Sequence, residues 1–248
     1  MEKASSKKYE IDMCNGPLLG KIMIFYVPLM LSGILQLLFN AADIVVVGRF
    51  AGNQALAAVG STGSLTNLLV NIFIGLSVGA NVLVARYYGA KQDIQLKGMV
   101  QTAIATALAG GIILIFLGFF LARPALGCMG TPDDVISHSV LYMRIYFAGM
   151  PFMMVYNFGS AVLRAVGDTK RPLYYLLIAG VVNVVLNLVF VIVFHMGVAG
   201  VATATVASQA ISAALVVRCL IFTDSPYRLE LKGMKIAPDK LFRMIQIG

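Results

Sequence analysis

Long runs without a charged side chain constrain this sequence more than any other feature. No Asp, Glu, Lys or Arg occurs between Lys21 and Asp43, from 51 to 85, from 98 to 122, or from 172 to 217. The last of these runs is long enough for two helices. A helix needs about 20 mainly apolar residues to cross a bilayer. Only 12% of the residues are charged, against about 25% in soluble domains. The sequence therefore predicts an all-α integral membrane protein.

The charge-free runs predict a bundle of six transmembrane helices. A turn at 195–197 divides the longest run into two spans. The predicted helices cover residues 20–46, 54–84, 98–121, 135–163, 172–194 and 199–221. We therefore expect a polar N-terminal tail at 1–19, a transmembrane bundle at 20–222 and a separate segment at 223–248.

Lysine and arginine are divided unevenly between the two sides that this arrangement defines. Sixteen of the 19 lie on the side of the chain ends, while Arg49 and Arg123 lie on the other. Arg144 lies within a span, and we expect it to turn outward or to pair with Asp133 or Asp134. Since cytoplasmic loops carry the excess of basic residues, both ends are predicted to be cytoplasmic, with the bundle in the cell inner membrane. The division also explains the net charge of +8, so membrane lipid, and no nucleic acid, is the expected partner.

The segment 223–248 differs in kind from the spans. Its end alternates polar with apolar residues: Lys240, Arg243 and Gln246 stand among Leu241, Phe242, Met244, Ile245 and Ile247. Such a pattern is typical of a helix that lies on a membrane surface. We expect a cytoplasmic amphipathic helix that leads toward a further, absent span.

Catalytic and metal chemistry find little support. Three scattered cysteines and two isolated histidines give no metal-ligand spacing, so no metal or cofactor is expected. Residues 75–79 match G-x-S-x-G, but that nucleophile elbow requires a strand, a turn and a helix. Here the motif lies inside a predicted span, with no histidine at the depth of Ser77, so the chain is not expected to be an enzyme. Gly75 and Gly79 instead form a GxxxG step, which lets helices approach closely.

Asp43 is the polar residue that most needs an explanation. A carboxylate deep in a span costs about 2.5–3.5 kcal/mol on insertion scales and usually faces a cavity or a partner. Gln36, Asn40 and Asp43 stand at i, i+4 and i+7, so they form one polar stripe on a helix. An alternative places Asp43 at the outer headgroups. We favour a water-accessible interior, in which Asp43 binds a proton from one side, releases it to the other and attracts cations when ionised.

Other predicted spans also carry polar residues at helical spacing. Asn183 and Asn187 lie four residues apart in one span. The remainder comprises Asn67, Asn71, Asn157, Thr203, Thr205 and Gln209. Hydrogen bonds between helices, worth about 0.6–2 kcal/mol each, explain most of these residues.

Two stretches resemble a known family. The first covers 28–60, with the stripe of Gln36, Asn40 and Asp43 and the run ALAAVG at 55–60. The second is LRAVGDTKRP at 163–172, which is followed by Asn183, Asn187 and the run ATAT at 202–205. Together they resemble the multidrug and toxic compound extrusion (MATE) family over nearly the whole chain.

The resemblance implies a cation-coupled drug exporter made of two six-helix lobes around a central cavity, of which this chain is one. It implies H⁺ or Na⁺ as the coupling ion and cationic amphipathic molecules as substrates. The first-helix Asp of the family takes part in ion coupling, and here that residue is Asp43. In the branch that resembles the DNA-damage-inducible F proteins, polar residues surround it. Together with Asn40 from the stripe, the matching positions are Gln36, Tyr142, Asn157, Asn183, Asn187 and Thr205.

The sequence departs from the family pattern in two respects. The position of Asn187 is often acidic in that branch, so a site with two carboxylates is not expected. The second six-helix half is also missing, which suggests a truncated or half-length form that a second copy or a C-terminal half would complete. Two alternatives remain: a lipid-linked oligosaccharide flippase of the same superfamily, and an inert or partner-dependent membrane remnant.

Overall fold

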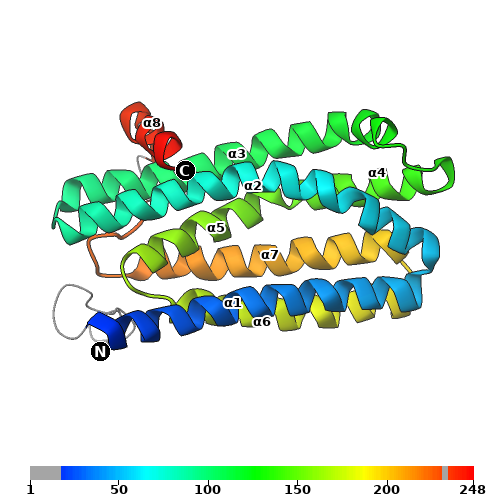
Figure 1. Cartoon of the computed structure of the whole chain (residues 1–248), viewed down its shortest axis with the longest axis horizontal. Helices are drawn as coiled ribbons and strands as arrows, with labels where there is room; N and C mark the ends of the chain where they lie inside the picture. Colours follow the sequence, from blue (N-terminus) through cyan, green and yellow to red (C-terminus); the bar gives the residue numbers. More distant parts are fainter. Residues whose placement is uncertain (1–17, 231–233) are drawn as a thin grey trace.

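The chain forms a single elongated bundle of helices (Figure 1). The structure is a computed structural model that describes residues 18–230 and 234–248, so the predicted tail at 1–19 lies almost wholly outside it. The helices are α1 (Leu18–Val46), α2 (Asn53–Gly89), α3 (Asp93–Cys128), α4 (Asp133–Ala148), α5 (Met150–Ala165), α6 (Lys170–Leu188), α7 (Gly197–Phe222) and α8 (Pro238–Ile247). Short π-helical turns, Val47–Ala51 and Val189–Val193, extend α1 and α6. The described residues contain no strand.

Within the part of the chain that the structure describes, five continuous helical segments are long and apolar enough to cross a membrane. The predicted span at 135–163 differs, because it consists of α4 and α5, which have 16 residues each and meet at Gly149. Pro151 has no N–H to continue the helical ladder. Around the break, Gly149 N–H donates to the Tyr146 carbonyl at 3.0 Å and Phe152 N–H donates to the Gly149 carbonyl at 3.1 Å. The all-α prediction is confirmed, with one span built from two helices.

Successive spans run in alternate directions along the bundle, with α4 and α5 running in the same direction as one span (Figure 1). The α2–α3 and α5–α6 connections and the segment after α7 lie at the end where α1 begins. Several helices extend past their predicted bounds; α3 covers 93–128 where 98–121 was expected. Charged residues therefore end a membrane span without ending the helix that carries it.

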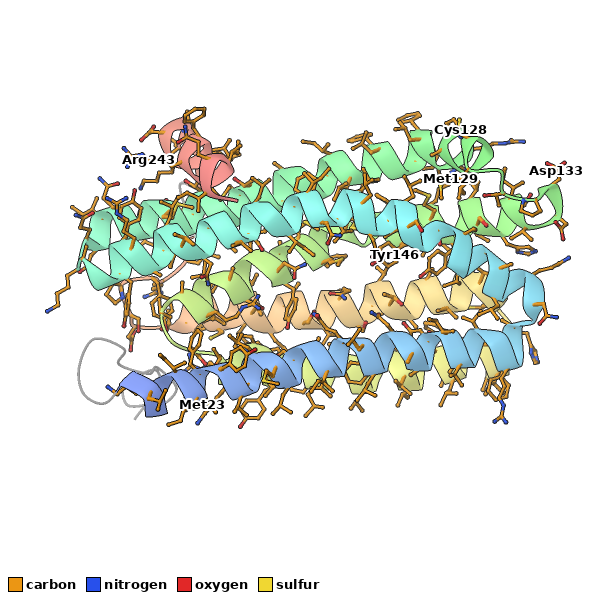
Figure 2. All side chains as sticks on the ribbon, in the orientation of Figure 1. Met23, Cys128, Met129, Asp133, Tyr146 and Arg243 are labelled. Carbon is orange, nitrogen blue, oxygen red and sulfur yellow. The ribbon has the colours of Figure 1, made fainter. Side chains whose placement is uncertain are left out.

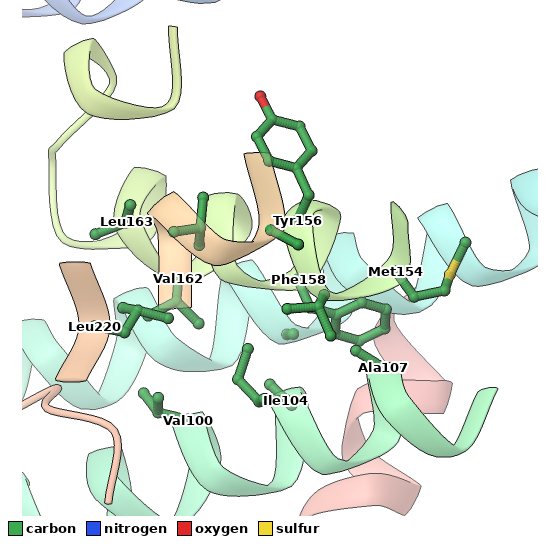
Figure 3. Packing of buried hydrophobic residues seen from close by; sticks show 14 of the residues in the cluster. Val100, Ile104, Ala107, Met154, Tyr156, Phe158, Val162, Leu163 and Leu220 are labelled. Atoms are coloured by element: carbon green, nitrogen blue, oxygen red, sulfur yellow. The ribbon is translucent and has the colours of Figure 1, made fainter. Parts of the chain in front are cut away.

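The apolar core is centred on α3, α5 and α7 (Figure 3). Ile104 and Ala107 of α3 meet Phe158 and Val162 of α5, and Leu220 of α7 closes the cluster. Small residues bring the helices close together. A Cβ at Gly111 would lie 2.8 Å from the backbone nitrogen of Pro151, and closer still to its Cα.

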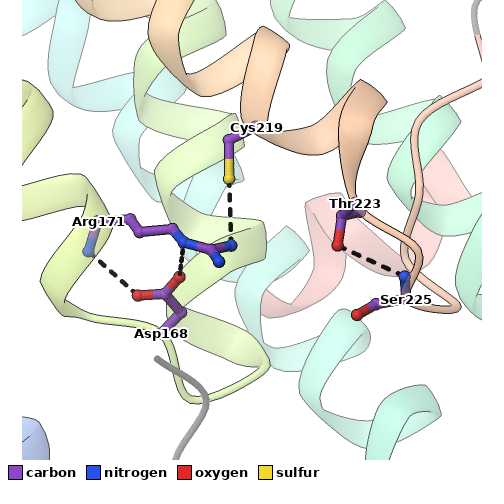
Figure 4. A network of polar contacts seen from close by, with 5 residues as sticks. All are labelled: Asp168, Arg171, Cys219, Thr223 and Ser225. Atoms are coloured by element: carbon purple, nitrogen blue, oxygen red, sulfur yellow. Dashed lines mark hydrogen bonds and ion pairs between the residues drawn. The ribbon is translucent and has the colours of Figure 1, made fainter. Parts of the chain in front are cut away.

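A polar network fixes the α5–α6 connection (Figure 4). Gly167 has φ +91°, a left-handed conformation that favours glycine. It ends α5 in a Schellman motif, in which Asp168 N–H donates to the Leu163 carbonyl at 2.9 Å. The buried Asp168 carboxylate accepts the Arg171 backbone N–H at 3.1 Å and pairs with its guanidinium at 3.3 Å. Arg171 also donates to the Cys219 Sγ at 3.4 Å, which ties α6 to α7.

Substituting Gly111 by Ala should separate α3 from α5, because the clash involves backbone atoms that cannot rotate away. Overpacking of this kind typically costs about 1–3 kcal/mol. We expect a clearly lower apparent melting temperature in detergent. Gly60→Ala is the matched control, since nothing lies within 4 Å of its added Cβ; equal melting temperatures for the two variants would contradict this account.

Candidate functional site

Asp43 points into the lobe and not toward lipid. It stands eight residues before Ala51, about 12 Å along the helix, and its side chain is partly buried. The Asn187 side-chain amide of α6 donates a hydrogen bond to the Asp43 carboxylate. Asn187 is fully buried, so the carboxylate is held by a group that water does not reach from outside. This contact argues against a position of Asp43 among the headgroups.

A chain of hydrogen bonds continues from Asp43 across the lobe. Asn187 Nδ2 also donates to Asn183 Oδ1 at 3.3 Å, and Asn183 Nδ2 donates to Thr205 Oγ1 of α7 at 3.5 Å. Thr205 in turn donates to the Val201 carbonyl at 3.0 Å, so its hydroxyl is oriented by its own helix. The chain therefore joins α1, α6 and α7 through one carboxylate, two amides and one hydroxyl.

The Asn187 side chain also carries a carbonyl oxygen, Oδ1. Within the described residues, its buried Oδ1 has no hydrogen-bond partner. Leaving a buried acceptor unpaired costs about 1–3 kcal/mol, so such an atom calls for an explanation. Carboxylate and amide-carbonyl oxygens are the ligand types that hard cations prefer, and a carboxylate also binds a proton.

Two stacked tyrosines border this group. The rings of Tyr142 and Tyr146 on α4 lie 5.9 Å apart with an interplanar angle of 21°, and both are within electrostatic range of Asp43. The Tyr146 hydroxyl donates to Met153 Sδ at 3.8 Å. Figure 2 shows Tyr146 between the helices of the lobe. Stacked rings beside an acid suit a flat, positively charged molecule.

A small pocket opens beside the tyrosines, at the break between α4 and α5. Its empty volume is about 200 Å³, part of which is open to solvent. The lining residues are Tyr146, Gly149, Met150, Met153, Thr205, Val206 and Gln209. Thr205 therefore belongs both to the pocket and to the hydrogen-bond chain, which links the hollow to Asp43.

Both π-helical turns follow directly on the central pair. One begins four residues after Asp43 and the other two residues after Asn187, and the two turns contact each other. Turns of this kind occur frequently at functional sites. They widen the ends of α1 and α6 beside the carboxylate, a feature that sequence periodicity gave no means of finding.

Three of the expected site residues are not joined to this group. Gln36 and Asn40 are exposed on α1, and Asn157 of α5 is half-buried. No hydrogen bond links any of them to the described residues around Asp43. The polar stripe of α1 thus runs from an exposed face of the lobe to the inward-facing Asp43.

Three of the residues that line the pocket were not assigned to the site from sequence. They are Tyr146, Met153 and Gln209. The one sequence signal that could have placed Tyr146 in the site is its i, i+4 spacing from Tyr142.

Of the two expectations for Arg144, the ion pair with Asp133 or Asp134 does not occur among the described contacts. The side chain is exposed, as expected if it turns outward, and its guanidinium lies over the Phe119 ring, 4.5 Å from the centroid. The described residues contain no group of three His, Cys, Asp or Glu side chains that could hold a metal ion.

The MatE family model matches residues 28–189. Probable multidrug resistance protein YoeA of Bacillus subtilis is 38% identical over 189 residues, covering 75% of this chain and 41% of that protein. Probable multidrug resistance protein YpnP of the same organism is 35% identical over 204 residues, covering 81% and 45%. The chain thus spans less than half the length of these two relatives.

Solved structures share the fold. An outward-facing conformation of a multidrug resistance MATE family transporter of the MOP superfamily matches with a TM-score of 0.85 at 23% identity, over 92% of this chain and 50% of that one. A MATE in the bent conformation matches with a TM-score of 0.84, also at 23% identity, over 92% and 51%.

Replacing Asn187 by Leu should destabilise the lobe, because the Asp43 carboxylate then loses its amide donor. Hydrogen bonds to charged groups contribute about 1.5–3 kcal/mol, so the apparent melting temperature in detergent should fall. Asn71→Leu, at an exposed position on α2, is the control and should change little. The double variant Asp43→Leu/Asn187→Leu completes the test. If its loss of stability equalled the sum of the losses in Asp43→Leu and Asn187→Leu, the two residues would not interact.

Proposed function

This chain belongs to the MATE family, and from that membership we propose that it acts in cation-coupled export of small cationic molecules. It is a multi-pass membrane protein. The observation that carries the proposal is the inward-facing Asp43 carboxylate, held by the buried Asn187 amide beside stacked tyrosines. The expected site comprises Gln36, Asn40, Asp43, Tyr142, Asn157, Asn183, Asn187 and Thr205.

The proposed chemistry is competition for one negative charge. When Asp43 is ionised, it attracts a cationic substrate or a coupling ion, but not both. A proton would neutralise the carboxyl group, while Na⁺ would use the carboxylate together with the free Oδ1 of Asn187. Binding of the ion on one side of the membrane would thereby release substrate on the other. Since position 187 carries an amide, a single carboxylate serves the exchange.

The tyrosines and the pocket provide a place for the substrate beside the acid. Ring faces attract cations, and methionine packs against ligands of varied shape. Tyr146 and Met153 supply both properties at the α4–α5 break. The enclosed part of this hollow is far too small to hold a drug-sized molecule, so we propose that a second lobe completes the cavity. That lobe would be a C-terminal half or a second copy of this chain.

We propose that both chain ends face the cytoplasm and that the membrane is the inner membrane. The uneven distribution of lysine and arginine supports this orientation. A lipid-linked oligosaccharide flippase is less well supported, because recognition of a pyrophosphate calls for basic side chains in the cavity. Arg144, the basic residue within the fourth span, is a poor candidate for that role, because it is exposed and its guanidinium lies over the Phe119 ring.

Ethidium efflux from drug-sensitive cells that express this chain tests the proposal. The chain should accelerate efflux, and Asp43→Asn should slow it at least about ten-fold, because a charge-assisted contact worth more than about 1.4 kcal/mol is lost. The exposed Asp134→Asn serves as the control and should retain efflux. Efflux unchanged by Asp43→Asn would remove the ion-coupling role from this residue. If the chain gave no efflux although it was present in the membrane, this lobe would not be sufficient by itself.

The coupling ion can be identified in everted membrane vesicles. With H⁺ coupling, addition of ethidium to acid-loaded vesicles should release protons in a chain-dependent manner. With Na⁺ coupling, ethidium movement should require a Na⁺ gradient and survive collapse of the pH gradient. Asp43→Asn should abolish whichever response is present. Drug movement that persists without either gradient would exclude cation coupling.

A further inference from the structure

The amphipathic helix α8 is seated firmly on the side of the bundle. Its Met244 is fully buried against the core cluster, and its backbone lies against the glycine step of α2. A Cβ at Gly75 would lie 3.0 Å from the Gly248 carbonyl oxygen, and one at Gly79 would clash with the Met244 carbonyl. The partner of the predicted GxxxG step is therefore α8.

The start of α8 is tied to the charged end of α3. Ala237 N–H donates to the Thr102 hydroxyl at 3.3 Å, and Lys240 Nζ donates to the Gln95 carbonyl at 3.0 Å. Gln95 lies two residues after the start of α3, whereas Gly75 lies 14 residues from the end of α2, about 21 Å along that helix. The helix α8 thus descends from the level of the charged loops toward the apolar middle of the bundle.

The outward face of α8 combines apolar with basic side chains. Phe242, Ile245 and Ile247 are all exposed, Phe242 by 62%. Arg243 of α8 is exposed, as is Lys235 in the segment that precedes the helix; Figure 2 shows Arg243 beside α8, on the side toward the end of the bundle where α1 begins. Neither basic side chain forms an ion pair within the described residues.

Nearby acidic residues do not neutralise this face. The Glu230 carboxylate pairs with Lys97 at 3.1 Å. Within 234–248, Asp239 is the one acidic residue, whereas Lys235, Lys240 and Arg243 are basic. We propose that the outer face of α8, together with the segment just before it, binds acidic phospholipid, with Phe242 and Ile245 among the acyl chains and Lys235 and Arg243 at the headgroup phosphates. Each basic residue near an acidic surface contributes attraction that falls within a Debye length.

The absence of tryptophan from the chain makes a direct test possible. Phe242→Trp places a sole indole on the proposed surface. The purified full chain is reconstituted in vesicles of equal parts phosphatidylglycerol and phosphatidylcholine, with brominated acyl chains on one lipid or the other. We expect brominated phosphatidylglycerol to quench the indole at least about two-fold more strongly than brominated phosphatidylcholine, with the preference shrinking at high salt.

Two controls separate lipid selectivity from general burial in the bilayer. Ile34→Trp, on the exposed face of α1, should be quenched equally by both lipids. Adding Lys235→Gln and Arg243→Gln to Phe242→Trp should equalise the quenching, whereas Arg49→Gln and Arg123→Gln at the other end should leave the preference intact. Lys240 is retained because it supports the fold. Equal quenching of the Phe242→Trp chain by the two lipids, no quenching at all, or a preference that survives removal of both charges would each overturn the proposal.

Discussion

The lack of hydrogen-bond partners for the backbone in hydrocarbon governs this molecule. Each span has to satisfy its own N–H and C=O groups, which only a helix does in a single segment. Departures from the α-helix therefore occur where neighbouring helices enclose them. The break at Gly149 and Pro151 packs against α3 and α7, and the two π-helical turns pack against each other. These same places surround Asp43, so the irregular backbone and the polar group share one protected region.

The polar group follows the same rule at the level of side chains. A carboxylate in this setting needs donors from other helices, and α6 offers the amides of Asn183 and Asn187 on one face. The hydroxyl of Thr205 extends the chain to α7. Because the hydrogen-bond chain joins three helices, a shift of α1 relative to α6 changes the surroundings of Asp43. The charge state of Asp43 and the packing of α1 are thus linked through one amide.

Sequence patterns anticipated much of the fold because charge is excluded from hydrocarbon. The gaps between charges placed the spans, but they did not indicate that the fourth one divides into α4 and α5 at Gly149. The helical ends beyond the spans were not predictable, since charged residues continue a helix in water. For the site, periodicity indicated that Gln36, Asn40 and Asp43 share a face, but not which helix that face meets. The contact with Asn187, the neighbouring Tyr146 and the seat of α8 on Gly79 depend on tertiary packing.

The poor burial of α1 has a consequence for how the chain is made. Among the described helices it has extensive contact with α6 alone, and about 120 residues separate the end of the α1 span from the start of α6. At about 5–20 residues per second, the ribosome needs roughly 6–24 seconds to synthesise them. During this interval α1 has to stay in the bilayer with Asp43 lacking its amide donor. Its long apolar stretch is what retains it there until α6 arrives.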